Sequence, residues 1–131
     1  MKFTLPIAPR TKKNHSQLVT LKNGRQMLLP SKSYKEFEKD VCSWVKLNLN
    51  EIEPISSPVN MACRFYKDKD YRSDLPGYLQ AICDALVKAN VFTDDNHKII
   101  CSTDGSEVLL DRKNPRIEIE ITERKNNEYG L

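Results

Sequence analysis

The sequence predicts a single α+β domain, in which one mixed β-sheet carries two main helices packed on one face. Three observations predict this fold. The chain has 131 residues, 39% of them hydrophobic, which suffices for one core but not for two ordinary domains. Alternating runs typical of strands are separated by two stretches with apolar residues at helical spacing. Their order, strand, hairpin, helix, strand, helix, strand, strand, indicates two layers.

The first third of the chain predicts a strand, a loop and a hairpin. Residues 2–8 alternate weakly and suit a strand, whereas PRTKKNH carries a proline and several charges that do not suit a sheet centre. The stretch LVTLKNGRQMLL predicts a hairpin. Its Asn23-Gly24 pair can adopt the positive φ angles that a tight two-residue turn requires.

The first helix is predicted to follow this hairpin, with Ser31 or Ser33 as its N-cap. Its core-facing stripe consists of apolar residues at helical spacing, namely Tyr34, Phe37, Val41, Trp44 and Val45. The segment VNMACRFYK, residues 59–67, then predicts a strand that runs out into a charged loop.

The second helix is predicted to begin directly after Asp74, which stands at the N-cap position, with Pro76 in the first turn. Its apolar face consists of Leu75, Leu79, Ile82 and Leu86. Two strands, KIICST and RIEIEIT, are expected to follow, and the clean alternation of the second predicts burial of one face. We expect residues 1–122 to form the domain and residues 123–131 to be a frayed tail.

Charge is distributed unevenly along the chain. Residues 1–35 contain eight Lys or Arg and no Asp or Glu, whereas the remainder contains 13 basic and 18 acidic residues, a net charge of −5. A basic segment joined to an acidic remainder is typical of a polyanion-binding protein with a cation-binding site. A solvated basic face without a partner is the alternative interpretation.

Cysteine spacing and hydropathy bear on whether the protein binds zinc or enters a membrane. The four cysteines include no CxxC pair, so reduced thiols are predicted and a zinc site is not. No apolar run approaches the ~20 residues that a membrane span needs, and no signal-peptide core develops near residue 1. These features predict a cytoplasmic protein.

The segment RSDLPGYLQAICDALVKANVFTDDN places acids before, within and after the second helix. Asp74 and Asp84 would lie about 15 Å apart along a continuous helix and cannot share one ion. Extended residues running back after the helix could bring Asp94 or Asp95 towards Asp74, within one chain or equally across a dimer. Separately, these acids also suit a helix cap, an ion pair of Asp84 with Lys88, and a turn.

Taken together, this segment resembles the RusA family of Holliday junction resolvases, and the resemblance covers roughly residues 3–122. RSDLPGYLQAICDALVKANVFTDDNHKI is similar to the family signature D-x-D-N-x-x-K-x-x-x-D-A-L with its later Asp-Asp pair, and NPRIEIEITE is similar to the closing strand. The proline and Lys-Lys-Asn of the N-terminal loop are also similar. The resemblance implies a homodimeric, Mg²⁺-dependent crossover junction endodeoxyribonuclease, with Mn²⁺ as a possible substitute and no small-molecule cofactor.

Such an enzyme resolves four-way DNA junctions by paired nicks in recombination and repair, and small family members are common on prophages. The resemblance implies that four acids are catalytic, with Asp74 and Asp95 as metal ligands and Asp84 and Asp94 as supporting acids. The sequence departs from the signature at three positions. Pro76 replaces a second aspartate, Gly77 replaces an asparagine, and Gln80 stands where family members place a lysine. These departures favour, as an alternative, a catalytically impaired junction-binding protein.

Two loops carry the residues expected to contact DNA, which are Lys12, Lys13, Asn14, His15, Lys67, Lys69 and Arg72. Contacts from such cations to phosphates are insensitive to sequence and sensitive to salt, as suits recognition of junction shape. Tyr66 and Tyr71 are candidates for stacking on unpaired bases, although Tyr66 also suits core packing. A third hypothesis is a small dimeric interaction module whose acids only cap and turn.

Overall fold

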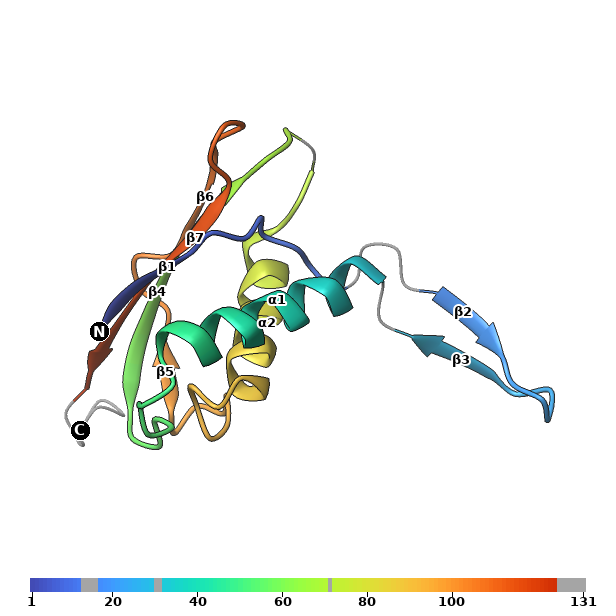
Figure 1. Ribbon diagram of the computed structural model, residues 1–131, viewed down its shortest axis with the longest axis horizontal. Coiled ribbons are helices and arrows are strands. Elements are labelled where there is room, and N and C mark those ends of the chain that lie inside the picture. Colours follow the sequence, from blue (N-terminus) through green and yellow to red (C-terminus); the bar gives the residue numbers. More distant parts are fainter. Residues whose placement is uncertain (13–16, 30–31, 71, 125–131) are drawn as a thin grey trace.

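A computed structural model of the protein describes residues 1–12, 17–29, 32–70 and 72–124, with the backbone alone described for residues 17–19 and 27–29. Five strands form one mixed sheet with two helices on one face, which confirms the predicted fold class (Figure 1). The strand order is β1-β7-β4-β5, and β6 also pairs with β4. These strands are β1 (Lys2–Leu5), β4 (Val59–Lys67), β5 (Ile100–Ser102), β6 (Glu107–Leu110) and β7 (Arg116–Glu123).

The antiparallel pair of β4 and β7 forms the centre of the sheet. Alternate residues of both strands are buried, and the buried positions lie opposite one another in the order Met61 to Ile121, Cys63 to Ile119 and Phe65 to Ile117. The positions between them in β7 are Glu118, which is half-buried, and Glu120, which is exposed. The predicted burial of one face of this strand is therefore confirmed.

The first helix, α1 (Lys32–Asn48), buries the predicted stripe except for Trp44, which is half-buried. The Trp44 ring stacks on Phe3 of β1 with a centroid separation of 5.7 Å. Ser33 lies inside the helix, so its prediction as the N-cap is wrong, and Ser31 lies outside the described residues.

The second helix, α2 (Leu75–Lys88), begins after Asp74, as predicted. Its buried face is rotated from the predicted one because the Tyr78 ring stacks on Phe65 of the sheet, at a centroid separation of 5.3 Å. Leu75 and Leu79 are therefore only half-buried. The fully buried residues are Tyr78, Ala81, Ile82, Ala85 and Leu86.

The predicted hairpin is present as β2 (Gln17–Thr20) and β3 (Gln26–Leu29), and it extends away from the sheet and helices (Figure 1). The predicted two-residue turn is wrong. The Gly24 N–H donates to the Leu21 carbonyl, and Gly24 has positive φ while Asn23 does not. The resulting longer loop needs only one left-handed residue, and glycine supplies it.

The short strand β6 was not predicted, and the predicted KIICST strand is reduced to Ile100–Ser102. Both segments pair in parallel with the same edge of β4, one after the other. Strands this short carry too little alternation to be recognised. Among the described residues, no helix is long and apolar enough to cross a membrane.

Candidate active site

A cleft of about 420 Å³ opens where the N-terminal loop meets the start of α2. It combines one carboxylate, Asp74, with two cations, Lys12 and Arg72, so it suits a phosphate group and a counterion. The lining residues are Thr11, Lys12, Arg72, Ser73, Asp74, Gly77 and Gln80. Thr11 and Ser73 were not predicted, although each adjoins a predicted residue in the sequence.

Asp74 is both the N-cap of α2 and a wall of this cleft. Its Oδ1 accepts a hydrogen bond from the Gly77 N–H at 3.2 Å, which satisfies one of the free donors of the first helical turn. A Cβ added at Gly77 would overlap this Oδ1. The absence of a side chain at Gly77 therefore lets the carboxylate bend over the helix end.

Lys12 connects the cleft to the middle of α2. Its Nζ lies 2.7 Å from Oδ2 of Asp84 and 5.1 Å from the centre of the Tyr34 ring in α1. Lys12 thus fixes the N-terminal loop against both helices. The ion-pair partner of Asp84 in the structure is Lys12, rather than the Lys88 considered from helical spacing.

The Asp94-Asp95-Asn96 segment forms a turn in which the two aspartates differ in role. Asp94 accepts from the Asp95 N–H and from the Asn96 side chain, both at 2.8 Å, and these bonds lower its pKa. Asp94 therefore stabilises the turn. The Asp95 side chain interacts both with Asp94 in the turn and with Asp84 in α2.

Asp95 lies within hydrogen-bonding reach of Asp84. Partial desolvation, followed by the charge of Asp84, raises the pKa of Asp95. Cys83 adjoins the same pair, and burial, Asp95 and Asp84 together raise its pKa to about 12. Two carboxyl groups that repel each other are thus held together beside a protonated thiol.

The structure therefore brings Asp95 to Asp84, and Lys12 links Asp84 to the cleft that contains Asp74. Asp74 precedes Asp84 by ten residues, which corresponds to about 15 Å along the axis of α2. The carboxyl groups acting on Asp95 are those of Asp84 and Asp94. A metal shared by Asp74 and Asp95 stays a prediction.

Among the described residues, no three His, Cys, Asp or Glu side chains converge as a complete set of metal ligands. The donors present nevertheless suit Mg²⁺ or Mn²⁺. These ions prefer oxygen ligands, and Mg²⁺ is usually held by one or two carboxylates together with water and substrate phosphate. The Asp84–Asp95 pair matches this requirement in donor type and number.

Of the predicted DNA-binding residues that are described, Lys12 and Arg72 line the cleft and Lys67 contacts its wall. Lys67 Nζ lies 3.4 Å from Ser73 Oγ, and Lys69 and Arg72 are exposed. The guanidinium of Arg116 covers the Tyr66 ring at 3.7 Å, which occupies one face of a ring considered for base stacking. Other predicted contacts lie outside the described residues, namely Lys13, Asn14, His15 and Tyr71.

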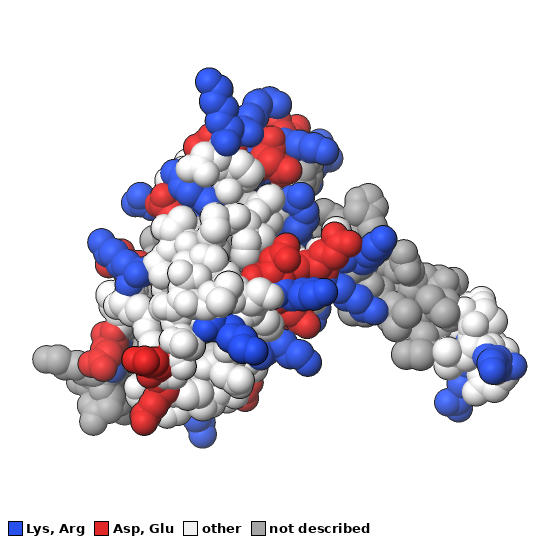
Figure 2. Space-filling view, in the orientation of Figure 1, with Lys and Arg blue, Asp and Glu red and all other residues white. Residues whose placement is uncertain are grey.

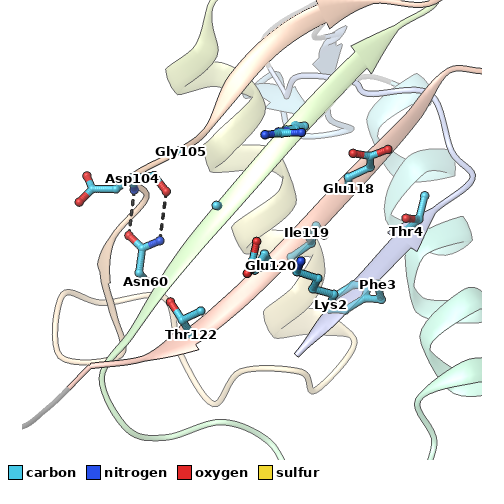
Figure 3. Close-up of a pocket in the computed structure, with 12 residues that line it drawn as sticks. Lys2, Phe3, Thr4, Asn60, Asp104, Gly105, Glu118, Ile119, Glu120 and Thr122 are labelled. Atoms are coloured by element: carbon cyan, nitrogen blue, oxygen red, sulfur yellow. Dashed lines mark hydrogen bonds and ion pairs between the residues drawn. The ribbon is translucent and has the colours of Figure 1, made fainter.

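A larger hollow, of about 600 Å³, lies on the sheet face opposite the helices (Figure 3). The carbonyl of Asp104 accepts from the side chain of Asn60 there, which holds the loop before β6 against β4. Two of its acids are paired, Glu120 with Lys2 and Glu118 with Arg116. This hollow contains none of the predicted catalytic acids.

A cleft that joins a carboxylate to bordering cations, on a small α+β domain, defines a candidate nucleic-acid hydrolase. A comparison with known families matches residues 6–122 to RusA, endodeoxyribonuclease RusA. The chain therefore belongs to the RusA family, whose members are endodeoxyribonucleases that act on Holliday junctions. This kind of nuclease generally depends on a divalent metal. No match was found among curated proteins.

Asp95→Asn is expected to raise the melting temperature at pH 7 in EDTA, because it removes the repulsion from Asp84. The raised pKa of Asp95 means that folding favours its protonated form, so this destabilisation is absent at low pH and develops as pH rises through that pKa. We expect a gain on the order of 1–2 °C at pH 7, limited by solvent screening, and none near pH 3. Thermal unfolding of the wild type and of Asp95→Asn between pH 3 and pH 7 measures this gain in melting temperature. An equal gain at both pH values would show that the effect does not come from repulsion between Asp95 and Asp84.

Proposed function

We propose that this protein is a Mg²⁺-dependent endonuclease, with Mn²⁺ as a substitute, that cuts four-way DNA junctions by paired nicks. The observation that carries the proposal is the arrangement along α2. The cleft at Asp74 and the Asp84–Asp95 pair are joined by Lys12, and exposed cations border the cleft. Family membership supplies the substrate class, which is branched DNA.

Asp95 and Asp74 are the proposed metal ligands, and Asp84 orients Asp95. When bound, Mg²⁺ lowers the pKa of its water and offsets the charge that develops on the attacked phosphate. Because Pro76 replaces a second aspartate, water or a phosphate oxygen would have to supply the remaining ligands of a bound metal. Asp94 contributes by holding the turn that directs Asp95, since its hydrogen bonds are made within that turn.

Cations of the cleft position the DNA backbone in this proposal. Arg72 is exposed beside Asp74, and Lys12 lies between the cleft and Asp84. Both can contact phosphate oxygens, which fixes the strand in register without reading its sequence. Gln80 lines the same cleft, and its neutral amide stands at the position where the family signature has lysine.

We further propose that the metal site forms between two subunits of a homodimer. Within one chain, Asp95 faces Asp84, and the length of α2 separates it from Asp74. A two-fold axis would place Asp74 of one subunit near Asp95 of the other and so generate two equivalent sites. Two such sites suit paired cuts in a junction that is itself approximately two-fold symmetric.

Asp74→Asn is expected to reduce cleavage of a synthetic four-way junction at least ~100-fold, because it removes a charged ligand. Asparagine keeps a side-chain oxygen for the helix cap, so folding and junction binding in EDTA should persist. Single-turnover cleavage with a Mg²⁺ and Mn²⁺ titration measures this. Asp104→Asn, on the opposite sheet face, is the matched control. A wild-type protein that binds junctions but cleaves none with either metal would exclude the nuclease proposal.

Mixing two inactive variants tests where the site forms. Asp74→Asn and Asp95→Asn subunits, co-expressed with different tags, should yield a mixed dimer with one intact intersubunit site. That dimer should nick one strand of the junction without the paired second cut, whereas each variant alone remains inactive. Denaturing gels of both strands distinguish these products. An inactive mixed dimer would mean that Asp74 and Asp95 of the same chain serve one site, and it would overturn the intersubunit proposal.

The alternative function is a junction-binding protein with impaired cleavage, which the residues Pro76, Gly77 and Gln80 favour. Pro76→Asp together with Gln80→Lys is expected to raise the single-turnover cleavage rate by about tenfold or more. Both changes suit the fold, since an acid is favourable in the first turn of α2 and the introduced lysine would stand four residues before Asp84. Unchanged cleavage by a folded, junction-binding variant would show that these departures do not limit the rate.

A further inference from the structure

Basic side chains gather at the end of the molecule where the turn between β6 and β7 meets the loop between β4 and α2 (Figure 2). Arg112 and Lys113 are both exposed in that turn, and Lys69 is exposed in the neighbouring loop. No ion pair is formed by these three side chains among the residues that the structure describes. The β6–β7 turn was not among the predicted DNA-binding segments.

The turn is held in a defined conformation by Asp111. Its Oδ1 accepts from the backbone N–H groups of Lys113 and Asn114 at 3.2 and 3.1 Å. The Asp111 N–H donates to the carbonyl of Lys67 at 3.0 Å, which joins the turn to the end of β4. Arg112 and Lys113 are therefore presented from a fixed backbone beside the predicted DNA-binding loop.

Acids near this turn are neutralised within the fold. Arg116 lies 2.9 Å from both Asp111 and Glu118, and its guanidinium is stacked on Tyr66. Asp68 pairs with Arg10 at 3.4 Å. Within the described part of these loops, the exposed cations Lys69, Arg72, Arg112 and Lys113 thus outnumber the acids that form no ion pair there, Asp70 and Asp74, and leave a local positive charge.

We propose that the β6–β7 turn is a second DNA contact, in which Arg112 and Lys113 bind backbone phosphates of a duplex arm of the junction. The turn adjoins Lys67, whose amine contacts Ser73 in the wall of the cleft. Lys67 therefore links the wall of the cleft to the turn, by its amine on one side and its backbone carbonyl on the other. The inference deepens the proposed function but concerns binding alone, so it does not require that the protein cleaves DNA.

The test is Arg112→Ala together with Lys113→Ala, compared with wild type in EDTA on a fixed four-way junction. We expect Kd to rise about 5- to 30-fold near 0.1 M salt and the slope of log K against log salt to decrease by about 2, because two phosphate contacts are lost. The control is Lys46→Ala with Lys88→Ala, which removes the same charge from the far ends of the helices. The exchanged pair Arg112→Lys with Lys113→Arg should bind nearly as wild type.

An affinity and salt slope equal to those of the control would overturn the proposal. So would a change in oligomeric state measured by sedimentation, since the turn would then bind another protein chain. Thermal unfolding verifies that each variant is folded. If wild-type protein binds junctions but does not cleave them, the nuclease proposal fails while this comparison still decides the role of the turn.

Discussion

The packing of α2 against the sheet determines where Asp74, Gln80 and Asp84 lie. Tyr78, Ala81 and Leu86 are buried, which leaves Gln80 exposed and Asp84 only partly covered on the outer side of the same helix. The contact between Tyr78 and Phe65 sets this rotation. Because the helix is rigid, the separation of Asp74 from Asp84 is a fixed length, and other parts of the chain must reach each acid from outside.

Two segments of the chain reach Asp84, and their electrostatic effects on it are opposite. The N-terminal loop brings Lys12 to Asp84, and this attraction fastens the loop to the helices. The turn after the helix brings Asp95 to the same carboxylate, where like charges repel. The fold thus keeps one favourable and one unfavourable contact at a single residue. Unfavourable charge of this kind is expected where a protein binds a cation.

Residue patterns predicted the long strands and the two helices well, because a long element carries many residues of its pattern. The alternation in β7 and the cap at Asp74 depend on local chemistry, so the sequence alone was sufficient for both. The partner of Asp95 depends on the direction of a turn, which follows from bonds that Asp94 makes with its neighbours. The strand β6 was missed because its four residues, Glu107–Leu110, carry too little alternation to be recognised. Sequence reasoning named the acids but could not assign which of them meet.

The pairing of β1 with β7 has a consequence for how the chain folds. The Met1 amino group bonds to the carbonyl of Ile121, a separation of 120 residues. At a synthesis rate of roughly 5–20 residues per second, β7 is made about 6–24 s after β1. Such distant pairing also slows folding, because loop closure precedes any gain from contact. The brevity of β1, ended by Pro6, limits the unpaired backbone that could bind another nascent chain in that interval.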